Sequence, residues 1–467
     1  MYVAKILLTE PETQLGYLLL QKLKQDYEVL AITNDVPLRP DEENVKWVQA
    51  DLFSLREANQ VLKDIDIGIY LVHSMTPNAR LTQANFQDMD AMLADNFARA
   101  SKRNGVKHIV YLSGLMPKHK ILSKHLDSRR ECEKILGSYG IPVTALRTGI
   151  IVGSNETSYS ILENIVKRMP IIPLPKYAHN KTLPVAMEDV IDALNTIVNR
   201  EADAHKIIDI GVKHHYTYKE LFKITAQILK KKRIMFDMPI IPLWLSKFVI
   251  SNIVPNDKAT VYPLMDSLIH DMTRRPEHTE YPLSYGKLDL ISSIMKTTSY
   301  QIKKVDLVKR EAPKGVKSIQ RFEIPTTYTM DDIALNYGRY LHAVTLSIVD
   351  STIEEDCFTI RIPFLNIPII VMAKDVEHSS PDRVLYYIKG GKLTNKKGIG
   401  NARLEFRRIL DSNEVIIALQ EFEPSLPWYV YKYTQALVHK IVMDLYRIYL
   451  NHWVNKHVET QTKTLDT

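Results

Sequence analysis

The stretch KILLTEPETQLG, residues 5–16, passes from an apolar run through a short polar turn into an amphipathic segment. The run ILL at 6–8 is typical of a buried strand, and the segment that begins at Gly16 is typical of a helix. A strand, a tight turn and a helix in this order expose backbone N–H groups at the helix N-terminus, where a phosphate can bind. We therefore expect the first unit of a dinucleotide-binding sheet, with Thr9, Thr13 and Gly16 as cofactor-binding residues.

The glycines of this turn are incomplete. A phosphate loop of this kind uses three glycines, and this chain keeps only the last, Gly16. Glu10 and Thr13 replace the two that let the backbone approach a phosphate, and Glu10 and Glu12 add negative charge beside an anion site. The turn therefore predicts the fold together with weakened cofactor binding.

Apolar runs alternate with helical patterns over the first 150 residues. Strands are expected at Lys5–Leu8, Tyr27–Ile32, Lys46–Gln49, Ile67–Val72, His108–Leu112 and Val143–Arg147. Helices are expected at Gly16–Gln25, Leu55–Lys63, Asn85–Asn104 and Leu126–Tyr139. This alternation predicts an α/β fold, a Rossmann-like doubly wound parallel sheet. With a less regular substrate-side extension, we expect this domain to cover residues 1–300.

The pattern changes after a polar, basic stretch, KREAPKGVKS at 309–318. We expect a linker at 301–319 and a separate domain at 320–467. Strands are expected there at Phe358–Ile362, Pro368–Ala373, Val384–Ile388, Arg403–Arg408 and Glu414–Gln420, followed by a long helix at Tyr429–Trp453. Antiparallel strands followed by one long helix predict an α+β domain of the helix-grip type.

Two interpretations of this second domain are open. The run 364–372 is expected to face a helix stripe formed by Tyr429, Tyr433, Leu437, Ile441 and Leu445. If these faces do not close fully, they enclose a pocket for a hydrophobic ligand such as a lipid or a quinone-like molecule. If they interdigitate, they form a dry core.

Composition narrows the class of protein. The chain has 467 residues, of which 45% are hydrophobic and 25% charged, which is typical of two or three globular domains. Lys and Arg exceed Asp and Glu by only 61 − 54 = 7, so we expect no nucleic-acid partner. Cys132 and Cys357 form no CxxC motif, which predicts no metal site and favours a reducing cytoplasm. The first strand begins at once, so no signal peptide is expected.

The most apolar long stretch is IMFDMPIIPLWLSKFVISNIV, residues 234–254. Asp237, two prolines and Lys247 interrupt it, so it does not meet the requirement for a membrane span. One interpretation is buried structure that lines a groove. The other is a peripheral membrane contact through 230–254, in which Trp244 and Phe248 enter the interface and the Lys/Arg cluster at 230–233 meets anionic headgroups.

Polar residues follow three of the expected strands at the carboxyl edge of the sheet, where open α/β folds bind ligands. The pair Asp51-Leu52 follows the third strand, and the acid can reach an adenine. The pair His73-Ser74 follows the fourth strand, and Ser113 ends the fifth. Their order and spacing predict a dinucleotide site.

Five segments carry a family resemblance: IYLVHSM (69–75), NFARASKRNGVKHIVYLSGL (96–115), HLDSRRECEKIL (125–136), VTALRTGIIVGS (143–154) and IVPNDKATVYPLMDSL (253–268). They resemble the atypical short-chain dehydrogenases of the NmrA-like branch, which includes the NADPH-binding accessory subunit of respiratory complex I. The stretch at 400–443 resembles the uncharacterised C-terminal domain of large bacterial members. The resemblance implies a Rossmann fold and NAD or NADP as cofactor.

The resemblance also implies an altered active site. Active members use Tyr-x-x-x-Lys, in which the tyrosine is the acid or base and the lysine lowers its pKa. The matching residues here are His125 and Arg129, while the serine that polarises the substrate is present as Ser113. His125 could move a proton near neutral pH or be a solvent-facing histidine at a helix start. Arg129 could bind a ribose or phosphate.

The cofactor preference stays open, because both Asp35 and Arg39 follow the second strand. We expect a cytoplasmic, NAD(P)-binding, oxidoreductase-like protein of low or unknown activity on an unidentified substrate, with a small-molecule or hydrophobic ligand as its partner. The alternative is a non-catalytic binding or regulatory protein that keeps the fold without cofactor turnover.

Overall fold

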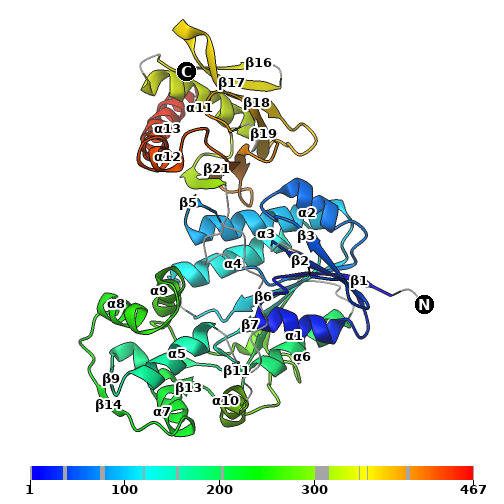
Figure 1. The fold of residues 1–467 in the computed structure, drawn as a ribbon, viewed down its shortest axis with the longest axis vertical. Helices are drawn as coiled ribbons and strands as arrows, with labels where there is room; N and C mark the ends of the chain where they lie inside the picture. Colours follow the sequence, from blue (N-terminus) through cyan, green and yellow to red (C-terminus); the bar gives the residue numbers. More distant parts are fainter. Residues whose placement is uncertain are drawn as a thin grey trace. The chain divides into compact units, whose positions relative to one another are not determined.

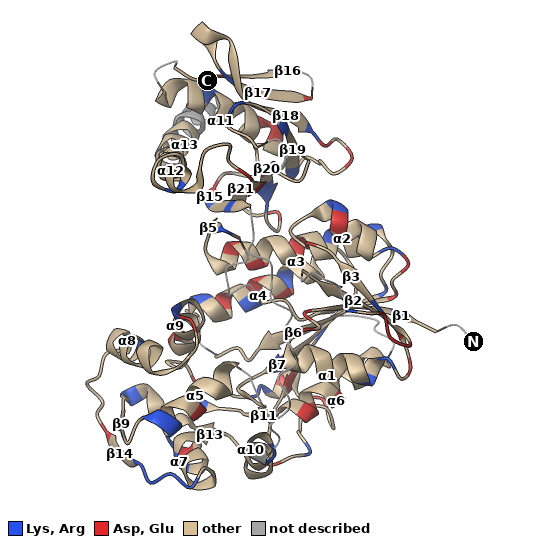
Figure 2. Ribbon diagram, in the orientation of Figure 1, with Lys and Arg blue, Asp and Glu red and all other residues tan. Residues whose placement is uncertain are grey.

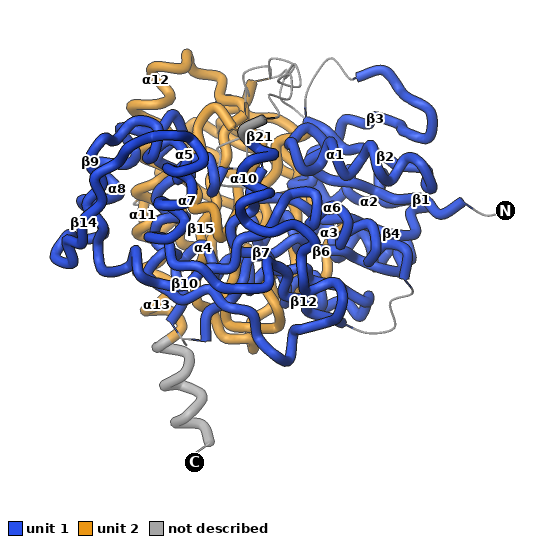
Figure 3. Tube along the Cα trace, turned by 90° about the horizontal axis from the view of Figure 1, so that it is seen from below, with its two compact units in different colours: residues 1–76, 90–311 blue, residues 77–89, 312–467 orange. Residues whose placement is uncertain are grey.

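The computed structural model describes residues 3–34, 39–73, 79–118, 121–153, 157–200, 205–299, 315–345, 348–354, 356–395 and 400–465. The chain divides into two compact units, which Figure 3 shows in different colours. Unit 1 consists of residues 1–76 and 90–311, and unit 2 consists of residues 77–89 and 312–467.

Unit 1 is built on a parallel sheet in the order β12-β7-β6-β4-β1-β2-β3 (Figure 1). Its strands are β1 (Lys5–Thr9), β2 (Glu28–Thr33), β3 (Val45–Gln49), β4 (Ile67–Tyr70), β6 (His108–Gly114), β7 (Val143–Thr148) and β12 (Lys206–Ile210). The strand order reverses between β1 and β4, the point at which such sheets open a crevice for a ligand. The predicted Rossmann-like doubly wound sheet is confirmed.

Helices cover both faces of this sheet. They are α1 (Gln14–Leu23), α2 (Leu55–Val61), α3 (Phe86–Arg103), α4 (Lys124–Gly137) and α6 (Met187–Val198). Figure 1 shows α1 and α6 on one face and α3 and α4 on the other. Leu19 of α1 and Leu194 of α6 are fully buried against strand residues such as Leu8. Hydroxyl caps start three of the helices, at Thr13, Ser54 and Ser123.

The rest of unit 1 forms the substrate-side extension. Its elements are β8 (Ile151–Val152), α5 (Thr157–Arg168), β9 (Ile171–Leu174), η1 (Lys176–His179), β10 (Lys181–Thr182), β11 (Val185–Ala186), β13 (Tyr216–Thr217), α7 (Tyr218–Ile228), β14 (Ile234–Asp237), α8 (Leu243–Ile253), α9 (Lys258–Ser267), η2 (Pro276–His278) and α10 (Leu290–Ser299). Within the described residues, no helix is both long enough and apolar enough to cross a bilayer.

Unit 2 is built on a sheet in the order β16-β17-β18-β19-β20-β21-β15-β5. Its elements are β5 (Leu81–Gln83), β15 (Val316–Glu323), α11 (Met330–Val344), β16 (Asp350–Glu354), β17 (Cys357–Ile362), η3 (Pro363–Leu365), β18 (Ile367–Lys374), β19 (Arg383–Gly390), β20 (Arg403–Arg408), β21 (Glu414–Phe422), α12 (Trp428–Tyr433) and α13 (Gln435–Leu465). Neighbouring strands are antiparallel except β5 and β15, which are parallel. The predicted separate α+β domain with an antiparallel sheet is confirmed.

The boundaries of the two units differ from the expected domain boundaries. β15 starts at Val316, inside the segment expected as linker at 301–319, because Val316 is buried in the core of unit 2. β5 comes from the segment 77–89, which lies between β4 and α3 in the sequence and within the expected first domain of 1–300. It joins unit 2 by pairing with the start of β15.

Aromatic side chains fill the core of unit 2 between its sheet and the helices α11 and α13. The rings of Tyr337 and Tyr446 lie 5.1 Å apart in an edge-to-face contact, and Tyr340 lies 4.8 Å from Tyr446. Phe322 and Phe406 of the sheet complete the cluster at 5.6 Å from Tyr446 and 5.8 Å from Tyr337. Such contacts add about 0.5–1.5 kcal/mol each to the burial of apolar area.

The expected helix stripe in this domain is wrong. The five residues expected to face the strands are exposed instead: Tyr429, Tyr433, Leu437, Ile441 and Leu445. The residues of α13 that enter the core are Ala436, Met443, Tyr446 and Leu450. Because α13 carries apolar residues on most of its circumference, the sequence did not distinguish the buried stripe from the exposed one.

Candidate functional site

The turn between β1 and α1 is held by two small residues. The Thr13 hydroxyl accepts a hydrogen bond from the N–H of Gly16 at 3.0 Å and donates one to the carbonyl oxygen of Glu10 at 2.9 Å. A Cβ on Gly16 would lie 2.1 Å from the same carbonyl oxygen, so no larger residue fits there. Glu10 has a φ of 54°, in the left-handed region that favours glycine. The turn therefore keeps a glycine-type backbone at Glu10 without the glycine.

Thr9 lies at the end of β1 and fastens it to the neighbouring strand. Its buried hydroxyl donates to the carbonyl oxygen of Ile69 at 3.2 Å and accepts from the N–H of Leu71 at 2.8 Å. Thr9 thus lies at the predicted edge, with its hydroxyl bonded to the backbone at the end of β4.

We expect Glu10→Gly to raise the free energy of unfolding by about 1 kcal/mol, because glycine adopts a positive φ without steric cost. Glu10→Ala is the matched control, since it removes the carboxylate and keeps the Cβ that causes the strain. Urea denaturation of both variants measures the difference. Equal stability of the two variants would contradict the strain at this position.

The predicted adenine side of the site lies after β3. One carboxylate oxygen of Asp51 accepts from the N–H of Phe53 at 3.0 Å, which shapes the turn into α2. Leu52 is buried, and its carbonyl oxygen accepts from the Asn96 side chain at 2.9 Å. The guanidinium of Arg39 lies 5.0 Å from the centroid of the Trp47 ring. Asp35, the other candidate for cofactor preference, lies outside the described residues.

A buried ion pair lies at the carboxyl end of β4. Arg129 of α4 donates through Nη2 to the Asp90 carboxylate of α3 at 2.9 Å and through Nη1 to the carbonyl oxygen of Val72 at 3.1 Å. The side chains of Arg129 and Asp90 are 5% and 1% exposed. Ser128 also donates to Asp90, at 2.8 Å. The guanidinium is therefore fixed at the end of β4, at the carboxyl edge of the sheet.

Two stacked histidines adjoin this ion pair. His73 Nδ1 lies 2.5 Å from Arg129 Nη2, and the His73 ring stacks on the His125 ring at a centroid distance of 5.2 Å. Because a guanidinium only donates, His73 Nδ1 accepts, and the proton of a neutral His73 lies on Nε2. His125 Nδ1 lies 3.2 Å from the hydroxyl of Ser267 in α9.

Both histidines are uncharged at neutral pH. Burial and then the charge of Arg129 lower the pKa of His125 to about 3, although Asp90 acts in the opposite direction. The same two causes, followed by the neighbouring His125, hold the pKa of His73 well below its usual range. His125 is thus not an imidazolium acid at neutral pH, and its ring at the start of α4 is half-buried, in contact with His73 and Ser267, rather than fully open to solvent.

We expect the free energy of unfolding to decrease as the pH is lowered, because His125 is neutral in the folded state. Its pKa in the folded state is lower than in the unfolded state, so the unfolded chain takes up a proton first as the pH falls below about 6.5. The free energy of unfolding is therefore unaffected by the protonation of His125 above that pH. At pH 5 it is lower by about 1 kcal/mol, allowing for partial solvent screening. Urea unfolding at pH 5 and pH 7.5 measures it. His125→Gln should show a smaller loss than the wild type, and an equal loss would contradict this assignment.

Ser113 belongs to a different polar group. Its hydroxyl donates to Oε1 of Glu133 at 2.7 Å, and the same carboxylate accepts two bonds from Arg147 at 2.9 and 2.6 Å. The hydroxyl that contacts His125 is that of Ser267. The three predicted catalytic residues are thus divided, with His125 and Arg129 in one cluster and Ser113 in another.

Sequence reasoning missed Asp90, Glu133 and Ser267. Asp90 could not be singled out, because Asp88 and Asp95 lie in the same helix. Glu133 and Ser267 left no signal, because their partners are distant in the sequence. Ser74 lies outside the described residues. Among the residues that the structure describes, no group of His, Cys, Asp and Glu could hold a metal ion.

Comparison with known proteins supports the fold and the family type of unit 1. Residues 13–169 match the family model described as NAD(P)H-binding. The chain is 30% identical over 142 residues to the auxiliary protein GraX of Staphylococcus aureus, which covers 30% of this chain and 42% of GraX. The chain thus spans less than half the length of that relative. Over this segment the match agrees with the predicted resemblance as far as an NAD(P)H-binding domain.

Solved structures show the same fold at low identity. A nucleoside-diphosphate-sugar epimerase from Staphylococcus aureus is 15% identical, with a TM-score of 0.51 over 63% of this chain and 100% of that chain. The triphenylmethane reductase of Citrobacter sp., complexed with NADP(H), is 16% identical with a TM-score of 0.49 over 63% of this chain and 99% of that chain. The epimerase shows a common fold and nothing finer.

Proposed function

We propose that unit 1 binds NAD or NADP along the carboxyl edge of its parallel sheet and works as an oxidoreductase-like protein with slow carbonyl chemistry. The dinucleotide would lie over Gly16 at the start of α1, with Asp51 on its adenine side and His73 and Arg129 on its nicotinamide side. When bound, the nicotinamide would supply or accept a hydride. The match of residues 13–169 to an NAD(P)H-binding family supports this assignment.

The observation that carries the proposal is the polar group beside the crevice. His73 Nε2 is buried and has no hydrogen-bond partner among the described residues, although it carries the ring proton. A buried donor without a partner is costly, so it points to a ligand acceptor. Arg129 next to it accounts for the acceptor role of His73 Nδ1 and so leaves the ring proton on Nε2, where a cofactor ribose or phosphate would accept it.

Two features support slow carbonyl reduction. His125, in the place of the usual tyrosine, is neutral, and a neutral imidazole is a poor acid. Ser113 donates to Glu133, so its hydroxyl is not presented to a substrate carbonyl. The remaining residues bind and orient a dinucleotide better than they transfer a proton.

Titration with NADH and NADPH, followed by calorimetry, tests the binding. Gly16→Ala should abolish binding, because the new Cβ collides with the carbonyl oxygen of Glu10. Gly137→Ala is the matched control, since its Cβ meets nothing closer than 3.5 Å. If Gly16→Ala does not fold, Glu10→Gly is the second arm and should tighten binding by removing a carboxylate near the phosphates. No heat with either dinucleotide up to about 1 mM would overturn the proposal.

We expect His125→Ala to leave the rate of NADPH oxidation with aldehydes, ketones or quinones within about twofold of the wild type. A true general acid contributes about 10²–10⁴ in rate, so its removal is easily seen. Steady-state absorbance of NADPH measures the rate. Fast turnover that disappears in His125→Ala would make His125 the acid and contradict the slow chemistry.

A non-catalytic binding or regulatory protein is the second candidate. The engagement of Ser113 by Glu133 favours it, because that contact removes the substrate-polarising hydroxyl. Dinucleotide binding without turnover on any substrate, or no dinucleotide binding with normal folding, would favour this candidate.

A further inference from the structure

The substrate-side extension carries exposed apolar side chains at the start of β9, on β14, on the loop that follows β14 and on α8. Ile240 is 81% exposed, Trp244 68% and Phe248 56%. The other exposed apolar residues of this surface are Ile171, Ile234, Phe236, Met238, Leu245 and Val249. We call these nine residues the β14–α8 surface. Water-exposed apolar groups that follow one another in this way mark an interaction site more often than isolated ones do.

Strand pairing explains why the apolar side of β14 is exposed. β14 pairs in parallel with β9, which places Ile234 beside Ile171 and Phe236 beside Pro173. Alternation along β14 directs Met235 into the core of the extension and Ile234 and Phe236 to the opposite side. Figures 1 and 3 both place α8 and β14 at the same end of unit 1.

Basic residues flank this surface. Lys230, Lys231 and Lys232 are exposed and run directly into β14, as Figure 2 shows in blue. Lys258 lies 6.0 Å from the centroid of the Phe248 ring. The exposed Asp237 is balanced by Lys219 at 2.7 Å and His179 at 2.9 Å. The margin of the apolar surface is therefore positive.

The length of α8 determines whether this surface could span a bilayer or only lie on it. α8 has 11 residues, which is about 16 Å of helix and about half the thickness of a bilayer core. It can lie in the headgroup region but cannot span the bilayer. Aromatic and aliphatic side chains beside lysines are the composition of interfacial helices, whereas protein interfaces are depleted in lysine.

We propose that the β14–α8 surface binds the surface of an anionic lipid bilayer. Trp244, Phe248 and Ile240 enter the boundary between headgroups and acyl chains, and Lys230–Lys232 meet the lipid phosphates. α8 packs on α9, and Lys247 of α8 forms an ion pair with Asp266 of α9, which precedes Ser267. Docking through α8 therefore brings the His125 cluster close to the bilayer. This inference does not depend on dinucleotide binding.

Flotation of the full chain with phosphatidylcholine vesicles, with and without about 30% phosphatidylserine, tests the proposal. We expect binding to the anionic vesicles that falls as the salt concentration rises, because the lysines act through screened charge. Trp244→Ser with Phe248→Ser should reduce binding by about tenfold or more. Lys230→Gln with Lys231→Gln and Lys232→Gln should remove the preference for anionic lipid.

Two controls separate this surface from other exposed apolar groups. Ile121→Ser changes an 84% exposed apolar residue elsewhere in unit 1 and should leave vesicle binding unchanged. Leu437→Ser with Ile441→Ser changes the exposed side of α13 in unit 2. Loss of binding in the α13 variant but not in the α8 variant would overturn the proposal. So would a self-association of the full chain in sedimentation that Trp244→Ser with Phe248→Ser abolishes while vesicle binding persists.

Discussion

Asp90→Asn is expected to lower the free energy of unfolding by about 3–5 kcal/mol, because it leaves the Arg129 charge buried without its partner. The substitution keeps the size of the side chain and removes only the negative charge. Arg129 would retain the carbonyl oxygen of Val72 and His73 Nδ1, neither of which carries a charge. Urea unfolding gives the size of the loss, and hydrogen exchange in peptides of α3 and α4 gives its location.

The matched control lies on α4, the helix that carries Arg129. Asp127 pairs with Arg130 at 2.6 Å, but these side chains are 48% and 42% exposed. Asp127→Asn should therefore cost no more than about 0.5 kcal/mol. Adding Arg129→Met to Asp90→Asn should recover much of the loss, since no buried charge then remains. A single Asp90→Asn variant as stable as the Asp127→Asn variant would contradict the buried pair.

The parallel sheet of unit 1 was predictable because its signals are local. Each expected strand between Lys5 and Arg147 overlaps an observed one, since buried parallel strands appear as short apolar runs. The helices begin after hydroxyl residues such as Thr13 and Ser123, which cap them through their own side chains. The second domain was predicted for the same reason, with β20 at its expected bounds.

The missed elements depend on distant pairing or on an overlooked cap. β5 has three residues and is held by β15, more than 200 residues away in the sequence. No local sequence pattern predicts such a short strand. α11 left a signal, because Thr329 and Asp332 form a capping box at its start. No element was expected between residues 320 and 357, so this signal was overlooked.

The candidate site was predictable in its position and not in its connections. The carboxyl edge follows from the parallel sheet, and Thr9, Asp51, His73 and Ser113 all lie at strand ends as the spacing predicts. Which groups bond to one another depends on the packing of α3 and α4. In that packing Arg129 donates a hydrogen bond to Asp90 and Ser113 donates one to Glu133, and neither pair could be predicted from the sequence.

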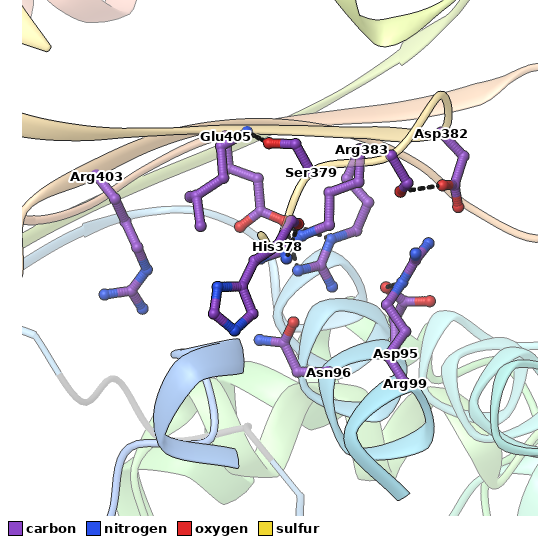
Figure 4. A network of polar contacts seen from close by, with 12 residues as sticks. Asp95, Asn96, Arg99, His378, Ser379, Asp382, Arg383, Arg403 and Glu405 are labelled. Carbon is purple, nitrogen blue, oxygen red and sulfur yellow. Dashed lines mark hydrogen bonds and ion pairs between the residues drawn. The ribbon is translucent and has the colours of Figure 1, made fainter. Parts of the chain in front are cut away.

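Glu405→Gln is the second substitution with a large expected effect, about 3–5 kcal/mol of lost stability. Figure 4 shows Glu405 beside Arg383. Oε1 of Glu405 accepts from Nε of Arg383 and from Nε of Arg407, both at 2.6 Å, and all three side chains are at most 1% exposed. Burial alone would raise the pKa of the Glu405 carboxyl, but the two arginines together hold it at about 2. Without this carboxylate, two buried positive charges lose the counter-charge that they share.

The pH dependence separates this charge effect from a packing defect. Because the folded pKa of Glu405 is lower than the unfolded one, its share of the stability is complete above pH about 4.5 and is lost as the pH falls toward 2. That share is about 3 kcal/mol, and Glu405→Gln should lack it at every pH. Glu414→Gln on β21 is the matched control, since Glu414 is 44% exposed beside Arg321 and should cost about 1 kcal/mol or less. Urea unfolding between pH 3 and pH 7 measures all three proteins. A Glu405→Gln variant whose loss is the same at both ends of this range would show that packing, and not the buried carboxylate, holds these strands.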